Sequence, residues 1–428
     1  MKIYHREEIN LFLQKFESRR SDVAQDVENA VSEILRNVRD RGDAALADYA
    51  AQFDRTDLEK FGIKVAGNEL KSAHQNLDEN LLAALRSSRK NIERFHSKSL
   101  PQSWFSWEED GVVLGQRVLP LERVGVYVPG GRAAYPSSLL MGVVPAQVAG
   151  VSEIVVVTPS DENGRVNQTI LAAAYELGID KVFRVGGAHA IAAMAYGTET
   201  IPRVDKIIGP GNIYVATAKK LLFGQCGIDM VAGPSEVAII ADAAADPVFV
   251  AADLLAQAEH DPLASAILLT DSTELAKNVQ IEFEKQLEKL SRKEIVLQSG
   301  ENYGGIILAD SMRECIHLCN KLAPEHLGLH VQNAWDMLGQ IINAGAIFLG
   351  SYSPETIGDY WAGPNHILPT NGSARFSSPL RAEDFMKTSS VISFTKKAMV
   401  KHADKIVTFA HSEGLDAHAN AIQKRISE

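Results

Sequence analysis

Cysteine is scarce in this chain: Cys226, Cys315 and Cys319 are the only ones among 428 residues. Three thiols cannot build a disulfide framework, and their scarcity favours a reducing compartment. Cys315 and Cys319 are one helical turn apart and could form half of a metal site, but no second pair exists, so buried apolar filling is the better interpretation. The segment 1–6 has no apolar signal-peptide core. We therefore expect a cytoplasmic protein.

Long hydrophobic runs and an excess of positive charge are also missing. No run approaches the roughly 20 apolar residues of a membrane-spanning helix. The 43 Lys and Arg residues are outnumbered by 54 Asp and Glu residues, which gives a net charge of −11 and disfavours a broad basic face for a polyanion. With 46% hydrophobic and 23% charged residues, the chain has an ordinary globular composition. We expect neither nucleic acid nor membrane among its partners.

What the chain does contain is a regular alternation of strand and helix patterns from Arg123 onward. Short apolar runs typical of buried strands occupy 124–128, 154–157, 182–185, 206–208, 237–240, 266–269, 306–308, 327–331 and 346–349. Repeated βα units imply parallel sheets covered on both faces, with ligands at the carboxyl ends of the strands. We predict an α/β protein of two Rossmann-like parallel-sheet halves, with small N- and C-terminal helical appendages.

The predicted domain division has four parts. Residues 1–22 form a helical arm, because this charged segment has too little apolar surface to fold alone. Residues 23–128 plus 238–380 form a first α/β domain, and residues 129–237 form a second one. Residues 381–428 form a helical tail. A crevice between the two α/β domains is the expected site.

Three Gly-rich turns follow predicted strands in the first half, at 125–131, 186–189 and 209–212. Each could bring backbone N–H groups close to a phosphate. None has the Gly-x-Gly-x-x-Gly spacing with a later acidic residue, so the dinucleotide fingerprint is absent. One such turn is usually ordinary loop geometry, whereas three together favour a nucleotide.

Glu325 and His326 mark the most informative stretch. An apolar helical pattern ends at Pro324, and an apolar strand pattern begins at Leu327. The corner between them can hold a carboxylate beside an imidazole, which is a natural proton-handling pair. The alternative is a surface turn with two polar residues.

A second group of polar residues has the composition of a metal site. Gln257 and His260 are three residues apart, so they share one face of a predicted helix end. Further nitrogen and oxygen donors lie downstream, at Asp359, His366, Glu413 and His418. A site without thiolate suits zinc, manganese or cobalt, with zinc as the default. The alternative is a set of unrelated polar residues on loops.

Over essentially its whole length the sequence resembles the histidinol dehydrogenase family. The matching blocks are 39–46, 124–138, 206–214, 231–236, 257–262, 323–327, 358–360, 363–381 and 413–418. Several long motifs in the same order are far more specific than any single Gly-rich turn.

The resemblance implies oxidation of L-histidinol to L-histidine through L-histidinal, as the last step of histidine biosynthesis. It implies two successive NAD-dependent hydride transfers at one site and one Zn²⁺ per subunit. The zinc and acid/base residues would belong to the first α/β domain and the NAD contacts to the second. The family is a homodimer with interlocked tails, so Glu413 and His418 would enter the site of the partner subunit.

The resemblance also implies a role for each matching residue. The acid/base pair is Glu325 and His326. The zinc ligands are Gln257, His260, Asp359 and His418. The substrate contacts are Ser235, His366 and Glu413, together with His326 and the four zinc ligands. The NAD contacts are Tyr127, Asn212 and His189. The family usually has Gln where this chain has His189, and an imidazole cannot both donate and accept at one end as an amide can.

Two other functions remain open. A related dehydrogenase could act on another polar alcohol, such as a sulfonated diol, but such a substrate would not need Ser235, His366 and Glu413. A zinc hydrolase could use Glu325 to activate water, but it would not need the Gly-rich first half.

Overall fold

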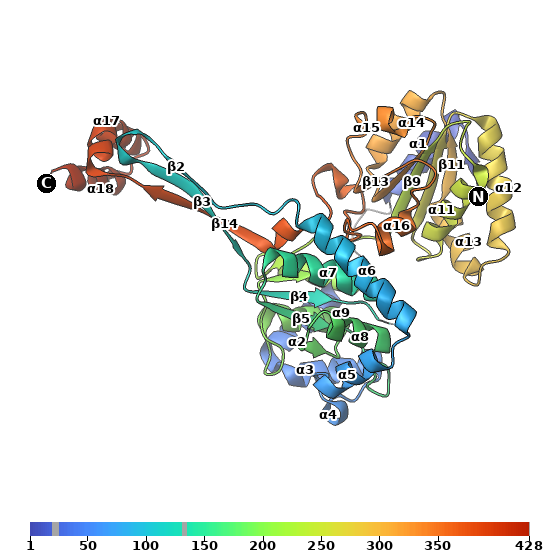
Figure 1. Ribbon diagram of the computed structural model, residues 1–428, viewed down its shortest axis with the longest axis horizontal. Coiled ribbons are helices and arrows are strands. Elements are labelled where there is room, and N and C mark those ends of the chain that lie inside the picture. The colour runs from blue at the N-terminus through green and yellow to red at the C-terminus, as the bar shows by residue number, and fades with distance from the viewer. Residues whose placement is uncertain (19–24, 131–134, 428) are drawn as a thin grey trace.

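The computed structural model describes residues 1–18, 25–130 and 135–427 and contains two parallel sheets and one antiparallel ribbon (Figure 1). Sheet A has six strands in the order β1-β11-β10-β9-β12-β13, and every neighbouring pair is parallel. Its strands are β1 (Ile3–Tyr4), β9 (Glu236–Ala241), β10 (Ser265–Thr270), β11 (Gly305–Leu308), β12 (His326–His330) and β13 (Ala346–Leu349).

Helices cover both faces of sheet A. They are α1 (Arg6–Ser18), α11 (Pro247–Ala258), α12 (Thr273–Leu287), α13 (Lys293–Asn302), α14 (Met312–Leu322), α15 (Ala334–Leu338) and α16 (Glu355–Tyr360). One buried cluster joins α1 and α14 to the sheet, and another joins α11 and α12 to the opposite strand faces. The strands are apolar on both sides because both sides are covered.

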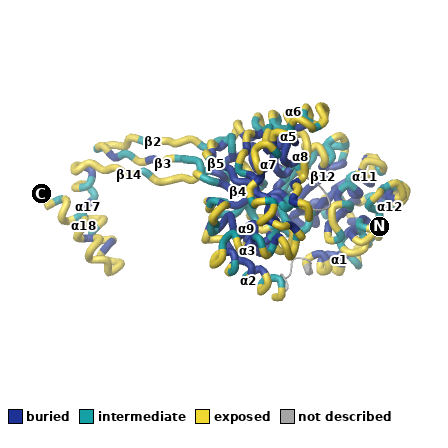
Figure 2. The backbone as a smooth tube through the Cα atoms, turned by 90° about the horizontal axis from the view of Figure 1, so that it is seen from below, coloured by how far each residue is buried: buried dark blue, intermediate teal, exposed yellow. Residues whose placement is uncertain are grey.

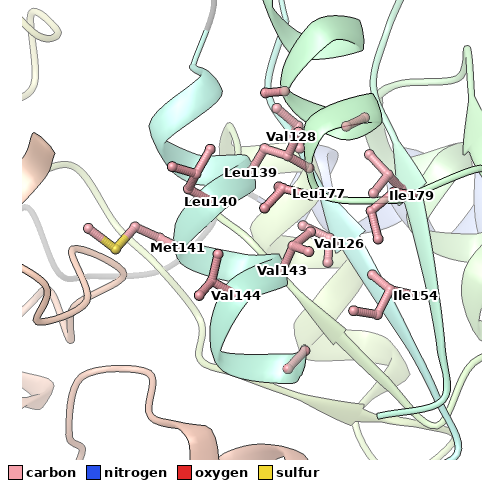
Figure 3. Packing of buried hydrophobic residues seen from close by; sticks show 14 of the residues in the cluster. Val126, Val128, Leu139, Leu140, Met141, Val143, Val144, Ile154, Leu177 and Ile179 are labelled. Atoms are coloured by element: carbon pink, nitrogen blue, oxygen red, sulfur yellow. The ribbon is translucent and has the colours of Figure 1, made fainter. Parts of the chain in front are cut away.

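Sheet B has five parallel strands in the order β6-β5-β4-β7-β8. They are β4 (Arg123–Tyr127), β5 (Glu153–Val157), β6 (Val182–Phe183), β7 (Lys206–Ile208) and β8 (Gly227–Ile228). The helices between them are α7 (Pro136–Ala149), α8 (Gln168–Glu176), α9 (Gly187–Tyr196) and α10 (Ile213–Leu222). Figure 3 shows the packing on one face, where Leu139 and Val143 of α7 join Val126 of β4 in a buried cluster.

The helices that precede β4 also belong to sheet B. They are α2 (Gln25–Arg41), α3 (Asp43–Tyr49), α4 (Leu58–Phe61), α5 (Gly67–Gln75) and α6 (Glu79–His96), with a π-helical turn, η1 (Ala50–Asp54), between α3 and α4. Val31 and Leu35 of α2 share a core with Val155 and Val157 of β5. Leu70 of α5 and helix α6 contribute to the core on the other face.

A three-stranded antiparallel ribbon carries the C-terminal helices. Its order is β14-β3-β2, with β2 (Trp104–Trp107), β3 (Val113–Pro120) and β14 (Met386–Ser393). Short 3-10 turns occur at η2 (Glu109–Gly111), η3 (Ser373–Arg375) and η4 (Ala382–Phe385), and the tail helices are α17 (Lys396–Ser412) and α18 (Asp416–Ile426). In both views the ribbon is largely exposed and holds the tail helices well away from the two parallel sheets (Figures 1 and 2).

The α/β prediction with two parallel-sheet halves is confirmed, but the chain is divided differently from the predicted boundaries. Residues 25–96 and strand β4 pack with sheet B instead of sheet A, and so do Ile367, Leu380 and Phe385. The reason is that α2 to α6 bury their apolar faces on sheet B, whose first strand, β4, follows them after the ribbon strands β2 and β3. The predicted tail begins with a strand, β14, that pairs with β3.

The predicted N-terminal arm is an integral part of sheet A, while its residues 19–22 lie outside the described residues. Ile3 and Tyr4 pair in parallel with Ile306 and Ile307. Four apolar side chains of α1 are buried in the core of sheet A, namely Ile9, Phe12, Leu13 and Phe16. In the described part of the chain, no helix combines the length and the apolar character needed to cross a membrane.

Candidate active site

Glu325 and His326 lie at the predicted helix-to-strand corner. Helix α14 ends at Leu322, and Ala323 adopts a left-handed conformation with φ 48° as its C-cap. Pro324 prevents the helix from continuing, and β12 begins at His326. Both side chains are buried, with exposed fractions of 6% for Glu325 and 4% for His326. The surface-turn alternative is therefore wrong.

The first residue of the neighbouring strand, Glu236, fixes both side chains. Its backbone N–H donates to Oε2 of Glu325 (2.8 Å), and its carbonyl oxygen lies 3.0 Å from Nδ1 of His326. Because a carbonyl only accepts, Nδ1 carries the proton and Nε2 of the neutral ring is the basic atom. Within the described residues Nε2 has no hydrogen-bond partner. Burial lowers the pKa of His326 to about 4, although the charge of Asp359 opposes this effect.

Helix α16 brings two carboxylates to the same place. One ligand atom each from His326, Glu355 and Asp359 lies within 4.8 Å of the others. The Gln257 amide, in the orientation that satisfies both groups, donates to the two Glu355 oxygens at 2.7 and 3.0 Å. Burial raises the pKa of Glu355 well above its usual value, and the charges of Asp359 and Glu325 add to this. Glu355 was not among the predicted site residues.

Asp359 is the electrostatic centre of this cluster. Burial alone would raise its pKa, but the neighbouring imidazoles of His366, His326 and His260 outweigh burial and lower it. Nδ1 of His366 is 3.6 Å from Oδ1 of Asp359. His260 lies exposed just beyond the end of α11, and half-buried Ser235 directly precedes β9. The cluster therefore gathers nitrogen and oxygen donors without a thiolate, which is the donor set that zinc accepts.

Glu413 and His418 do not join this cluster in their own chain. Both are exposed, and they line a hollow of about 610 Å³ between α17 and α18 with apolar neighbours such as Phe409 and Leu415. The ribbon keeps α17 and α18 far from α16 (Figure 1).

The three predicted cofactor contacts line a separate cavity of about 1070 Å³ on sheet B. Tyr127 ends β4, His189 lies in the first turn of α9, and Asn212 is the N-cap of α10. The side chain of Asn212 accepts from the backbone N–H groups of Tyr214 and Val215, both at 3.1 Å. The last residue of the first Gly-rich turn, Gly131, lies outside the described residues.

Tyr127 and His189 differ in how their polar atoms are satisfied. The Tyr127 hydroxyl accepts from the Gly187 N–H at 3.2 Å, and burial raises the pKa of Tyr127 to about 12. His189 is 1% exposed, lies near the rings of Tyr49 and Phe53, and has no partner for either ring nitrogen among the described residues. Burial lowers its pKa to about 4. Partnerless nitrogens, two helix N-termini and a ligand-sized cavity fit a dinucleotide.

The two sites lie at opposite ends of the strands of their sheets. The cavity lies where β4, β5, β6 and β7 end, as the sequence predicted for ligands of a parallel sheet. The acid/base cluster instead lies at the amino ends of β9 and β12. The physical reason is that Glu325 precedes its strand, and that Gln257, at the C-terminus of α11, lies at the same amino ends of the strands.

A buried acid/base pair on one parallel sheet and a nucleotide-sized cavity on another fit an α/β oxidoreductase. The family model of histidinol dehydrogenase matches residues 17–426. The chain is 52% identical over 408 residues to histidinol dehydrogenase of Listeria innocua, which covers 95% of both chains. It is 52% identical over 399 residues to that of Geobacillus kaustophilus, covering 93% of this chain and 94% of the relative.

A solved structure leads to the same family. Histidinol dehydrogenase from Elizabethkingia anophelis aligns with a TM-score of 0.94 at 38% identity and covers 100% of this chain and 98% of that one. This chain belongs to the histidinol dehydrogenase family.

Proposed function

We propose that this protein oxidises L-histidinol to L-histidine through L-histidinal, in two successive NAD-dependent steps at one site, as the last step of histidine biosynthesis. The observation that carries the proposal is His326. Its ring is neutral because burial lowers the pKa to about 4, and Nδ1 is held by the Glu236 carbonyl. Nε2 is thereby left as a fixed base for the proton of an alcohol.

Glu325 takes the second proton task. Its carboxylate is held by the Glu236 N–H, which is part of the same residue that orients His326. The aldehyde must gain water before it can be oxidised again, and a carboxylate at this position can accept a proton from that water. One anchoring residue thus aligns the base for the alcohol with the base for the aldehyde.

The donor set and the cavity support the two cofactors. Zn²⁺, when bound, would be held by Gln257, His260 and Asp359, with His418 from a second copy of this chain, and would orient the nitrogen atoms of the substrate. NAD, when bound in the cavity lined by Tyr127, His189 and Asn212, would accept hydride. Ser235, His366 and Glu413 would contact the polar ends of the substrate.

A homodimer completes the proposal. The tail residues Glu413 and His418 lie far from the cluster of their own chain, so each site would take them from the partner. The three cysteines are free and buried, which is compatible with the reducing cytoplasm.

The direct test is to supply purified protein with L-histidinol and NAD. We expect two NADH for each L-histidine formed, loss of this activity after complete removal of metal by a chelator, and its return with Zn²⁺. Absence of NADH formation in zinc-loaded protein would contradict the proposal and reopen the alternatives of another alcohol or a hydrolytic reaction.

A further inference from the structure

The turn that joins β7 to α10 touches the end of β4. Gly209 in this turn has φ 116°, and a Cβ at this position would lie 2.1 Å from the carbonyl oxygen of Tyr127. Three residues later Asn212 begins α10 and lines the cavity of sheet B. The position of Gly209 therefore determines how Asn212 and the N-terminus of α10 face the cavity.

Two buried side chains of opposite charge hold Gly209 from both sides. Nζ of Lys219 donates to the Gly209 carbonyl oxygen at 2.9 Å. Oδ2 of Asp229 accepts from the Gly209 N–H at 2.8 Å, and its other oxygen accepts from the Met230 N–H at 2.6 Å. Lys219 and Asp229 are also directly paired, and their side chains are 1% and 0% exposed.

Stability alone does not account for a charged pair at this depth. The desolvation of two buried charges is so costly that apolar residues of similar volume are often equally stable or more stable. Charge-assisted hydrogen bonds, in contrast, fix direction, and here both backbone groups of one glycine receive them. Neither Lys219 nor Asp229 lines the cavity, so any effect on a ligand must pass through the turn.

We propose that Lys219 and Asp229 are a positioning pair for the cofactor turn. The pair fixes Gly209 against the backbone of Tyr127, and it thereby sets the orientation of Asn212 and the first N–H groups of α10 toward the dinucleotide. Asn212 cannot correct a displaced turn by itself, because its side-chain oxygen already caps α10. The inference rests on the proposed use of NAD.

The test uses the double variant Lys219→Met/Asp229→Asn in the full zinc-loaded protein. This variant buries no unpaired charge, and an amide oxygen can still accept from the Gly209 N–H, but the bonds to the Gly209 carbonyl and from the Met230 N–H are lost. We expect the Kd for NAD, measured by calorimetry, to rise about tenfold or more, which corresponds to the loss of one well-formed hydrogen-bonding position. The KM for NAD should rise in parallel, while kcat at saturating NAD and the KM for L-histidinol stay within about twofold.

Arg123→Gln is the matched control. Arg123 pairs with Glu153 at 2.6 Å in the same sheet but at the amino ends of β4 and β5, away from the cavity. It should lower the melting temperature without changing the Kd for NAD. Hydrogen exchange of the 209–215 backbone should accelerate in the double variant only.

Each outcome decides a separate question. If the wild-type protein does not bind NAD, the proposed function is wrong. If the wild-type protein binds NAD and the double variant binds it equally well, the positioning role is wrong. An equal loss of NAD affinity in Arg123→Gln, or a double variant that cannot fold, would also overturn the inference, since the pair would then act on stability in general.

Discussion

His326 and His330 lie on the same strand, four residues apart, yet their surroundings assign them different tasks. Nε2 of His330 lies 3.0 Å from Oδ2 of Asp253, so a carboxylate side chain anchors this ring, while its Nδ1 has no partner among the described residues. His326 is held only through Nδ1, by a backbone carbonyl, and its Nε2 has no partner among the described residues. Both rings thus have one anchored nitrogen, but only His326 lies in the cluster with Glu355 and Asp359, where proton transfer to or from a substrate is expected.

Replacement of the pair Glu325 and His326 should separate the two oxidations. His326→Asn is expected to keep fold and zinc but to lower the rate of histidinol oxidation by about 10²- to 10⁴-fold, the usual contribution of a general base. Glu325→Gln is expected to impair mainly the conversion of histidinal to histidine. Each variant is assayed separately on L-histidinol and on L-histidinal.

His330→Asn is the control for this experiment, because it changes a buried imidazole on the same face of β12 without touching Glu236. It should keep both oxidations within about tenfold, less than a general base contributes. Equal losses on both substrates in His326→Asn and Glu325→Gln would contradict the division of proton tasks.

His189 gives the protein a predictable dependence of stability on pH. Burial lowers its pKa from 6.5 to about 4, so the native state favours the neutral ring. The unfolded state binds the extra proton between these values, and stability is therefore complete above about pH 6.5 and falls as the pH drops toward 4. At about 1.4 kcal/mol per pH unit, the full loss is on the order of 3 kcal/mol.

The variant His189→Gln removes this titration and keeps a polar side chain of similar length. Its thermal stability should decline less than that of the wild-type protein between about pH 6.5 and 4.5, and the two proteins should show parallel profiles above about pH 7. Because His96 is also buried with a pKa lowered to about 4, a residual slope is expected. Identical acid profiles would mean that His189 does not titrate as its burial requires.

At the scale of single residues, site residues that stand next to each other in the sequence could be predicted. A site residue without such a neighbour was missed. Glu325 and His326 are adjacent at a visible helix-to-strand corner. Glu355 begins the short helix α16, and its role depends on burial beside Asp359 and Gln257. The only signal for it was the four-residue spacing of Glu355 and Asp359, which places two carboxylates on one helical face.

Among the strand–turn–helix elements of sheet B, the β7–α10 turn has the least room. Gly209→Ala is expected to lower stability by about 3 kcal/mol or more, because the conformation disfavours an L side chain and the added carbon collides with backbone. Gly178→Ala separates the effect of a positive φ from the effect of the collision. Gly178 also has positive φ, 73°, but an added Cβ meets nothing within 4 Å.

The Gly178→Ala protein should therefore lose only about 1 kcal/mol. Thermal unfolding of both variants gives the comparison, and Gly209→Ala should also weaken NAD binding. If the two variants are equally stable, the turn can move away from Tyr127, and the close contact does not constrain it.

Strands with continuous apolar runs could be predicted, whereas the strands of the ribbon could not. β9 and β10 are buried along their whole length, so their sequences carry a strong apolar signal. β14 is a mostly exposed strand with several polar residues, and its partner β3 lies far away in the sequence. No local sequence pattern indicates such a pairing, because the pairing of the two strands stabilises it and not the burial of apolar side chains.

At the scale of the whole molecule, the tail lies far from the cluster of its own chain, so two different inactive chains should complement each other in a mixed dimer. A chain with Gln257→Ala and a chain with His418→Ala are each expected to be inactive alone. A mixed dimer should regain one intact site, in which one subunit supplies Gln257, His260 and Asp359 and the other supplies His418. Co-refolding of the two inactive chains should thus restore activity, up to half that of a wild-type dimer.

The control mixes Gln257→Ala with His260→Ala. Both changes lie on the same side of the site, so no mixed dimer has an intact set of ligands, and activity should stay absent. If heterodimers of the first pair form but remain inactive, the tail serves its own subunit.

The choice of sheet on which each helix packs explains the error in the predicted domain boundaries. Apolar periodicity can show that a helix such as α2 or α6 buries a face, but it does not name the sheet that receives this face. The structure shows that they pack on the strands of sheet B, and that the segment with Ile367 and Phe385 returns to the same core. No local sequence pattern shows that a segment returns to a core formed by residues far away in the chain.

The pairing of β1 with β11 has a consequence for biosynthesis on the ribosome. Ile3 lies beside Ile306, and Val113 of β3 lies beside Ser393 of β14. Strand β1 must therefore wait until residue 306 has been translated, and β3 of the ribbon must wait for residue 393. Sheet B, whose strands follow one another within 123–228, can fold early. During translation, the edge of sheet A and the ribbon are thus the surfaces that a chaperone would have to protect.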